Sequence, residues 1–274
     1  MCSFQVSALR HRPREKPPPS SPEGDKGGGF SLDVRCISHP AWGDGLNVFG
    51  GFDSILFDRV FCRNSDDCTT AYATRKGFSG STRNVTMRRS TLWADVAHPV
   101  FIGIHGNAER GDTIENLLYE NIDILGQAES QVDYQGCMAI NCGDNNTVRN
   151  VTFDNVRVEH IRRGCLVQVR VGYNQKYCAT PSRSVENVTF RNIRQWTDAY
   201  RESRRSDSVP QTSIICGYDA QRTVKGVTFE NLKVNGRVLH DKMKDKPSWY
   251  ATADYVPMFI GPHVEKVEFL GSER

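Results

Sequence analysis

The sequence VRNVTFDNVR (148–157) recurs along this chain at a regular interval, and this repeat decides the expected fold. Five related segments and one truncated copy show the same alternation of polar and apolar residues: FDSILFDRVF (52–61), RNVTMRRSTL (83–92), IENLLYENID (114–123), VENVTFRNIR (185–194), VKGVTFENLK (224–233) and VEKVEF (264–269). Intervals of 32, 34 and 37 residues separate the asparagines at positions 84, 116, 150 and 187. Repeats of this length are typical of solenoids and propellers.

A second, more apolar segment lies between consecutive copies of the repeat. These segments cover residues 69–73, 99–104, 137–141, 165–171, 213–217 and 256–260. Both kinds of segment are short and β-branched, and no long window has a helical period, so each repeat supplies at least two strands. A propeller blade would need four strands. We therefore expect an all-β chain that folds as a right-handed parallel β-helix solenoid of about six to seven coils.

One corner of the expected coils carries a recurring asparagine. It occurs at Asn121, Asn155, Asn192 and Asn231, whereas the first two repeats have Arg59 and Arg89 there. Asparagines stacked at the same corner of successive coils can form a hydrogen-bonded ladder. We expect such a ladder in the later coils only.

Composition and charge exclude several classes of function. The chain has 274 residues and a formal net charge of +3. Because basic and acidic residues are interspersed, no nucleic-acid partner is expected. No apolar run is long enough to span a membrane. Residues 1–29 are rich in proline, glycine and charge and are expected to be disordered, which leaves 30–274 as the folded domain. The first ten residues lack the features of a secretory signal, so the localisation is left open, as is the oligomeric state.

The nine cysteines do not have the spacing of metal ligands. None belongs to a CxxC pair with nearby histidines, so no metal site is expected. Several lie in apolar runs, such as GCLV (164–167), where cysteine behaves as a small buried hydrophobe. We expect most of them to be free thiols in the core.

Three aspartates lie about one coil apart. Asp44 precedes one coil, and Asp66 and Asp67 precede the strand of the next coil, 22 and 23 residues later. One turn of a β-helix would place Asp44 beside this pair. Asparagine, serine and aspartate also favour ordinary turns. Adjacent residues of a regular strand face opposite ways, so Asp66 and Asp67 reach one site only at a corner or bulge.

Crowded carboxylates suit hydrolysis of a glycosidic bond. One must stay protonated to donate to the leaving oxygen, while another stays ionised to activate water. Mutual repulsion separates their pKa values and so divides these roles. His98 occupies the corresponding position one coil later, and His105 follows its strand.

Three motifs in order resemble the polygalacturonase-like glycoside hydrolases of family 28, whose members are parallel β-helices. GDGLNVFG (43–50) and NSDDC (64–68) are similar to that family's T-D-G-x-x-V-x-G and N-x-D-D-C signatures, and HPVFIG (98–103) is similar to G-H-G-x-x-I-G. The resemblance runs from about residue 42 to the last repeat.

The resemblance implies roles for the residues that match its motifs. Asp66 would be the general acid, and Asp44 and Asp67 would hold and deprotonate the water. His98 would support the protonation of the acid or bind sugar. No metal or organic cofactor is implied, and the partner is a polysaccharide substrate.

One motif of the family differs in this chain. The family's R-I-K motif, whose cations hold the substrate carboxylate, is replaced by AIN (139–141), which leaves Asn141 as the candidate contact. Arg170, Tyr173 and Lys176 follow the next strand and could replace the lost cations, although a solvated loop has the same composition. Related dextranase-like enzymes act on neutral glucans and remain an alternative.

We therefore expect an inverting hydrolase of α-linked polysaccharide. The alternatives are a neutral α-glucan hydrolase and a truncated, inactive carbohydrate-binding β-helix, while a lyase ranks lower. The family normally has more coils before its first motif, so we expect N-terminal coils to be missing. For the same reason we expect the chain alone to be weakly active, because remote subsites position a polysaccharide for attack.

Overall fold

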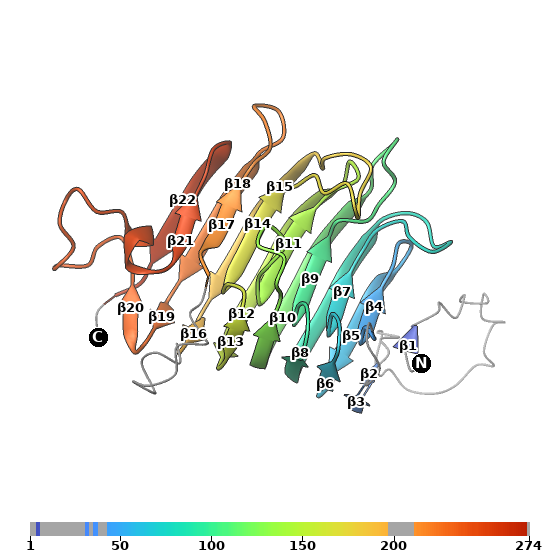
Figure 1. Cartoon of the computed structure of the whole chain (residues 1–274), viewed down its shortest axis with the longest axis horizontal. Helices are drawn as coiled ribbons and strands as arrows, with labels where there is room; N and C mark the ends of the chain where they lie inside the picture. Colours follow the sequence, from blue (N-terminus) through green and yellow to red (C-terminus); the bar gives the residue numbers. More distant parts are fainter. Residues whose placement is uncertain (1–3, 6–30, 33–34, 38–42, 197–210, 273–274) are drawn as a thin grey trace, which may run out of the picture.

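The computed structural model describes residues 4–5, 31–32, 35–37, 43–196 and 211–272, and these residues form an all-β structure. The only helical element among them is one turn of 3₁₀ helix, η1 (Thr252–Tyr255). The strands form two sheets that run side by side along the molecule (Figure 1).

The first sheet has eight strands, and their spatial order is the order of the sequence. In that order they are β1 (Phe4–Gln5), β4 (Leu46–Val48), β7 (Thr69–Ala71), β9 (Val100–Gly103), β11 (Met138–Cys142), β14 (Val167–Val171), β17 (Ser213–Cys216) and β21 (Met258–Ile260). All neighbours in this sheet are parallel.

The second sheet has fourteen strands. Its main path is β2 (Ser31–Leu32), β5 (Asp53–Asp58), β8 (Thr82–Ala94), β10 (Thr113–Ala128), β12 (Thr147–Val158), β15 (Ser184–Arg191), β18 (Val224–Glu230) and β22 (Val264–Leu270). Six short strands extend it beyond a bend: β3 (Arg35–Ile37), β6 (Phe61–Asn64), β13 (Ile161–Arg163), β16 (Arg194–Gln195), β19 (Leu232–Val234) and β20 (Arg237–Leu239). The only antiparallel strand pair in the described part is β19 with β20.

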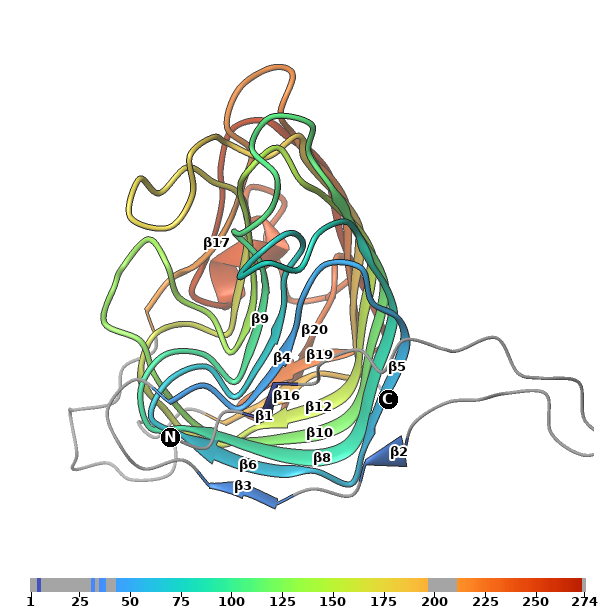
Figure 2. The same cartoon turned by 90° about the vertical axis from the view of Figure 1, so that its right-hand side faces the viewer.

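Each sequence repeat contributes one strand to each sheet. The repeated segments pair with one another in register; for example, Phe153 in β12 lies opposite Phe190 in β15. Figure 2 shows the successive turns of the chain stacked behind one another, with β5, β6 and β4 on three sides. The all-β, parallel architecture expected from the repeat is confirmed, and it is consistent with a β-helix.

Little of the N-terminal region belongs to the described structure. Of residues 1–29, expected to be disordered, only Phe4–Gln5 is described, and it forms β1 beside β4. The remainder of that segment lies outside the described residues. Strands β2 and β3 pair with β5 and β6, so strand pairing continues on the N-terminal side of the first full repeat.

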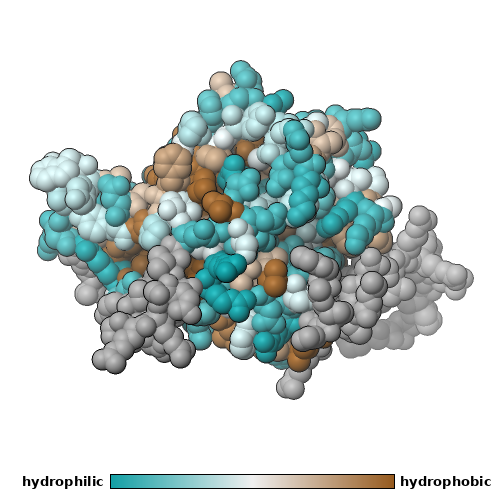
Figure 3. All heavy atoms as spheres, viewed as in Figure 1, coloured by the Kyte–Doolittle hydropathy of each residue, from teal (hydrophilic) through white to brown (hydrophobic). Residues whose placement is uncertain are grey.

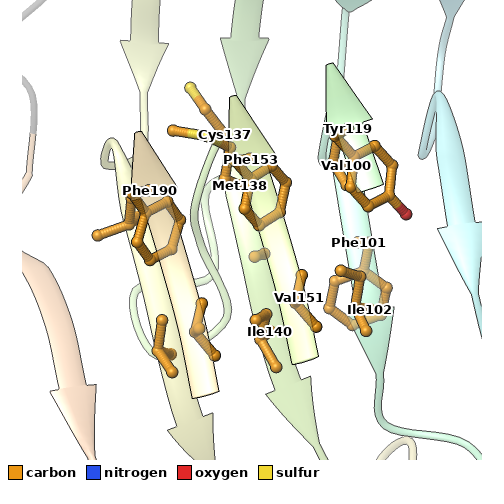
Figure 4. Close-up of a cluster of buried hydrophobic side chains, with 14 of the residues drawn as sticks. Val100, Phe101, Ile102, Tyr119, Cys137, Met138, Ile140, Val151, Phe153 and Phe190 are labelled. Atoms are coloured by element: carbon orange, nitrogen blue, oxygen red, sulfur yellow. The ribbon is translucent and has the colours of Figure 1, made fainter. Parts of the chain in front are cut away.

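The core is built from side chains that stack from one repeat to the next. The aromatic residue of the motif forms a continuous column of rings with centroids 4.8 to 5.2 Å apart, comprising Tyr119, Phe153, Phe190, Phe229 and Phe269. Figure 4 shows part of this column facing Met138 and Ile140 of the other sheet. The side chains that the two sheets direct toward each other are buried, so the inward positions of both sheets enclose one core.

Two columns of left-handed backbone make the chain turn at fixed points. The first contains a hydrogen-bonded ladder whose donor to acceptor distances are 2.7 to 3.2 Å, running through Asp53, Asn84, Asn116, Asn150 and Asn187. Its next position is Gly226, with a φ of 69°. Glycine and asparagine are the residues that adopt this conformation most readily.

The second column is the corner at which the sequence predicts a ladder. The Asn155 amide donates to Asn121 at 3.4 Å, and the Asn231 amide donates to Asn192 at 3.1 Å. Between these two pairs, the Asn192 amide donates to the Asp154 carboxylate instead, at 2.9 Å. The expected ladder is therefore present in the later repeats, with one carboxylate in its middle.

We expect Asn150→Ala to lower the free energy of unfolding by about 2 kcal/mol, since it forces alanine into a φ of 56° and removes two ladder hydrogen bonds. Asn150→Gly loses the same bonds without the backbone strain and should cost only about 1 kcal/mol. Urea unfolding of both variants measures the difference. Equal losses would contradict a conformational role for this column.

The cysteines of the described part lie mostly in the core as free thiols, as the sequence predicts. Seven cysteines are free in the described part, and all but Cys216 are buried. No helix among the described residues is both long and apolar enough to cross a membrane. On the face shown in Figure 3, hydrophilic residues predominate and hydrophobic residues form separate patches.

Candidate functional site

Three consecutive corners of the chain stack directly on one another and bring the predicted residues together. The Gly45 amide donates to the Asp67 carbonyl at 2.8 Å, and the Cys68 amide donates to the His98 carbonyl at 2.8 Å. A Cβ on Gly45 would lie 2.2 Å from the Cys68 carbonyl oxygen. Glycine is therefore required after Asp44, because the two backbones approach this closely.

Asp66 and Asp67 lie in the bend between β6 and β7 rather than on a strand. Because the two residues are not part of a regular strand, their side chains need not face opposite ways. One carboxylate oxygen from each of Asp44, Asp66 and Asp67 lies within 4.8 Å of the others. The predicted cluster of three aspartates is thus formed by two consecutive repeats.

The crowding divides the protonation states of these carboxyls. Partial burial, together with the charges of Asp67 and Asp44, raises the pKa of Asp66 to about 6. Burial and the charge of Asp67 also raise the pKa of Asp44, and a hydrogen bond from the Asn47 amide at 3.1 Å opposes this shift. Asp66 is therefore the carboxyl best suited to carry a proton near neutral pH.

Asp67 is held by a buried histidine. The ring Nδ1 of His98 donates to the Asp67 carboxylate at 2.7 Å, and Nε2 donates to the Tyr134 carbonyl at 2.7 Å. Because both partners are acceptors, both ring nitrogens carry protons and the imidazole is charged. Burial lowers the pKa of His98, but the charge and hydrogen bond of Asp67, together with Glu129 and the Tyr134 carbonyl, raise it above the ordinary value of 6.5.

The expected role of His98 needs correction. Its side chain is completely buried, so it does not contact a sugar. It pairs with Asp67 rather than Asp66, and its charge lowers the pKa of Asp66 instead of favouring protonation. His98 is therefore a positioning residue for Asp67. The sequence predicts the corner at which His98 lies. The direction of its side chain depends on the rings of Phe101 and Tyr134, which pack against it.

His105 lies at the far end of the same strand from His98, beside the Tyr72 ring, with ring centroids 5.0 Å apart. Burial and the nearby charge of Arg75 lower its pKa to about 3. The imidazole is consequently neutral at physiological pH. A neutral half-buried imidazole can exchange hydrogen bonds with sugar hydroxyls but cannot pair with a carboxylate.

Asn141 and Arg170 are neighbours in register on β11 and β14. Since Ile140 faces the core, the alternation of the strand directs Asn141 to the outer side of the sheet, where loops bury it. Its amide nitrogen has no partner among the described residues. Arg170 instead donates to the Asp133 carbonyl at 2.5 Å and so fixes the loop that carries Tyr134.

The other predicted contacts lie in the loop after β14. Tyr173 is 40% exposed. The ammonium of Lys176 lies 4.6 Å from the centroid of the Tyr177 ring and 3.5 Å from the side-chain oxygen Oε1 of Gln131. Asp66 is among the charges that act on this lysine, so Lys176 belongs to the surroundings of the aspartates.

Several residues of the site are absent from the sequence prediction. Tyr72 donates its hydroxyl to Asp67 at 3.3 Å, and the guanidinium of Arg75 lies 4.6 Å from the centroid of the Tyr72 ring. Arg75 and Lys76 also act electrostatically on Asp44. The sequence feature that could have predicted them is the position of this Arg-Lys pair just after the strand that follows Asp66 and Asp67. Arg75 comes close to the aspartates because it packs on Tyr72, whose hydroxyl reaches Asp67.

The three aspartates also form the only group of acidic, histidine or cysteine side chains in the described residues that could jointly hold a metal ion. Their donors are all carboxylate oxygens, which suit a hard cation such as Ca²⁺. Any such ion would use the same carboxyls that an acid and base mechanism requires.

Comparisons with known proteins add no relative. No protein-family model matches this chain, and no curated protein matches it significantly.

Proposed function

We propose that this chain is a right-handed parallel β-helix of six to seven coils that hydrolyses an α-linked polysaccharide with inversion. The observation that carries the proposal is the cluster of Asp44, Asp66 and Asp67, in which Asp66 has a pKa of about 6. A carboxyl with a pKa near 6 beside further carboxyls supplies the acid and the base that such a reaction requires. The family resemblance of the surrounding motifs supports the same reaction.

In the proposed reaction, Asp66 donates its proton to the glycosidic oxygen as the bond to the anomeric carbon breaks. Water attacks that carbon, and Asp44 or Asp67 accepts the proton released by the water. His98 holds Asp67 in place by pairing with it from the core side. No cofactor takes part in this scheme.

The spacing of the carboxylates bears on the stereochemistry. Acid and base in inverting enzymes usually lie about 6.5–9.5 Å apart. The nearest oxygens of the three aspartates lie within 4.8 Å of one another, which is shorter. In our proposal Asp44 and Asp67 hold the water jointly, in place of a single base across the sugar. NMR of the first product formed distinguishes inversion from retention, and a retained anomer would refute this step.

The substrate is a uronate polymer or a neutral α-glucan, and the site contains features of both. Asn141 offers an unpartnered amide where the related hydrolases have a cation. Arg75 and Lys76 nevertheless place positive charge near Asp44. Activity on polygalacturonate, dextran and mixed α-glucans separates the two, and a preference for the neutral glucans would indicate that uronate recognition is lost where Asn141 replaces the cation.

We expect hydrolysis to decline as the pH rises through about 6, because Asp66 then loses the proton that it donates. The logarithm of kcat/KM against pH should bend downward near that value. A Glu159→Gln variant, which removes an exposed carboxylate outside the site, should give the same profile. A rate that stays constant well above pH 6 would contradict the assignment of Asp66 as the acid.

A polysaccharide lyase is the second candidate, because the three carboxylates could hold Ca²⁺ and Arg75 lies close enough to act on Asp44. A lyase abstracts the proton next to a uronate carboxylate and leaves an unsaturated sugar that absorbs in the ultraviolet. Absorbing products that depend on added Ca²⁺ would favour the lyase over the hydrolase.

A further inference from the structure

A surface groove follows the bend of the fourteen-stranded sheet, away from the aspartates. It consists of two adjoining cavities of about 780 Å³ and 530 Å³ that share Asn192 and Arg194. In the first repeats the bend at Arg59 precedes β6, and Asp66 follows β6. An extended segment of that length spans roughly 20 Å, and this distance separates the bend along which the groove runs from the corner that carries the aspartates.

Amide side chains line the length of this groove. They come from successive repeats and comprise Asn121, Asn155, Asn192 and Asn231. Neighbouring strands are about 4.8 Å apart, which is close to the length of one pyranose ring. An amide nitrogen carries two N–H donors, and the ladder uses one of those of Asn155, Asn192 and Asn231, which leaves a donor on each for the hydroxyls of a sugar chain.

Two cations of the groove lie side by side without a carboxylate partner. Carboxylates also line the groove, and two of them, Asp154 and Asp245, are paired with the other arginines Arg191 and Arg237, while the third is Glu120. Arg194 in β16 is in register with Lys233 in β19, and Arg157 in β12 precedes them in the same row. Arg157 is paired with Asp123. Neither Arg194 nor Lys233 forms an ion pair with any residue that the structure describes. Like charges directly opposite each other on neighbouring strands are destabilising, so this pair has a cost that a bound anion would remove.

We propose that this groove binds an acidic linear polysaccharide, whose carboxylates pair with Arg194 and Lys233 while its hydroxyls contact the amides. Guanidinium groups bind carboxylates through two parallel hydrogen bonds. Single-stranded nucleic acid is a poorer fit, because none of the described residues that line the two cavities is aromatic and could stack on bases. The groove would hold the polymer independently of the reaction at the aspartates.

The test measures polygalacturonate binding by affinity electrophoresis in an Asp66→Asn background, which prevents turnover. Adding Arg194→Ala and Lys233→Ala should weaken binding about tenfold, and higher salt should reduce the difference. Adding Lys225→Ala, which removes an exposed lysine of the same sheet outside the groove, should leave binding unchanged. Thermal unfolding of the double alanine variant should be unchanged or shifted upward, because a repulsion is removed.

Unchanged binding in the double alanine variant would overturn the proposal, since any remaining affinity would then belong to the aspartate site. Equal binding of dextran, with the same loss in the variant, would also overturn it by showing that charge is not recognised. Tighter binding of a single-stranded DNA oligonucleotide would replace the polysaccharide with a nucleic acid. Weaker binding of polygalacturonate by the double alanine variant, with unchanged binding of dextran, supports the proposal.

Discussion

An Asp66→Asn variant is expected to lose about 10²- to 10⁴-fold in kcat on the polysaccharide that the wild-type chain cleaves, because a general acid contributes a factor of this size. Asparagine has the same shape and still accepts the hydrogen bond from the Asp67 amide, which is 2.9 Å long in the wild type. It has no proton to donate to the leaving oxygen. The loss should appear in kcat rather than in KM.

Stability measurements distinguish this catalytic role from a structural one. The pKa of Asp66 is raised in the folded state, so the protein loses stability as the pH rises from 3.8 through about 6 and this carboxyl is forced to ionise. The asparagine variant lacks that loss and should be at least as stable as the wild type at pH 7. A variant that is both inactive and less stable would refute the assignment, as would one with full activity. Glu159→Gln is the matched control.

A His98→Ala variant is expected to lose about 3–5 kcal/mol of unfolding free energy, because it removes one partner of a buried ion pair and leaves Asp67 without it. The same change should reduce activity, since Asp67 is no longer oriented. His98→Gln keeps a side-chain donor but no charge, so it should lie between the alanine variant and the wild type. Denaturant unfolding at several pH values measures all three proteins.

The pH dependence identifies the ion pair as the cause. Because the folded pKa of His98 is raised above 6.5, its contribution is fully present below pH 6.5 and is lost as the pH rises through the folded value. The difference between wild type and His98→Ala should therefore narrow at high pH. A difference that does not change with pH would assign the effect to lost packing against Phe101 and Tyr134 instead.

The repeat alone predicted most of the architecture, because each position in it has a local physical reason. Alternating residues such as Val151 and Phe153 bury one face of a strand. Asn150 and Asn155 adopt the left-handed conformation that turns the chain. The constant interval then places like residues next to one another. The column of aromatic rings and the asparagine ladders follow from that stacking.

The site was only partly predictable. The spacing of 22 residues between Asp44 and Asp66 indicated that one turn would bring them together, and the stacked corners do so. The inward direction of His98 was not predictable, because it depends on an acceptor contributed by Tyr134 from a later repeat. The placement of Arg75 beside Tyr72 depends likewise on how a loop folds back.

By itself, the sequence determined the strand pattern, the turns and the set of three aspartates, since these depend on local conformation and on a constant repeat length. Only the tertiary structure decided that Asp66 is the carboxyl whose pKa rises to about 6, because burial and the distances between charges set this value. It also decided that Arg194 and Lys233 lie side by side, since their alignment depends on the register between β16 and β19 and not on their separation in the chain.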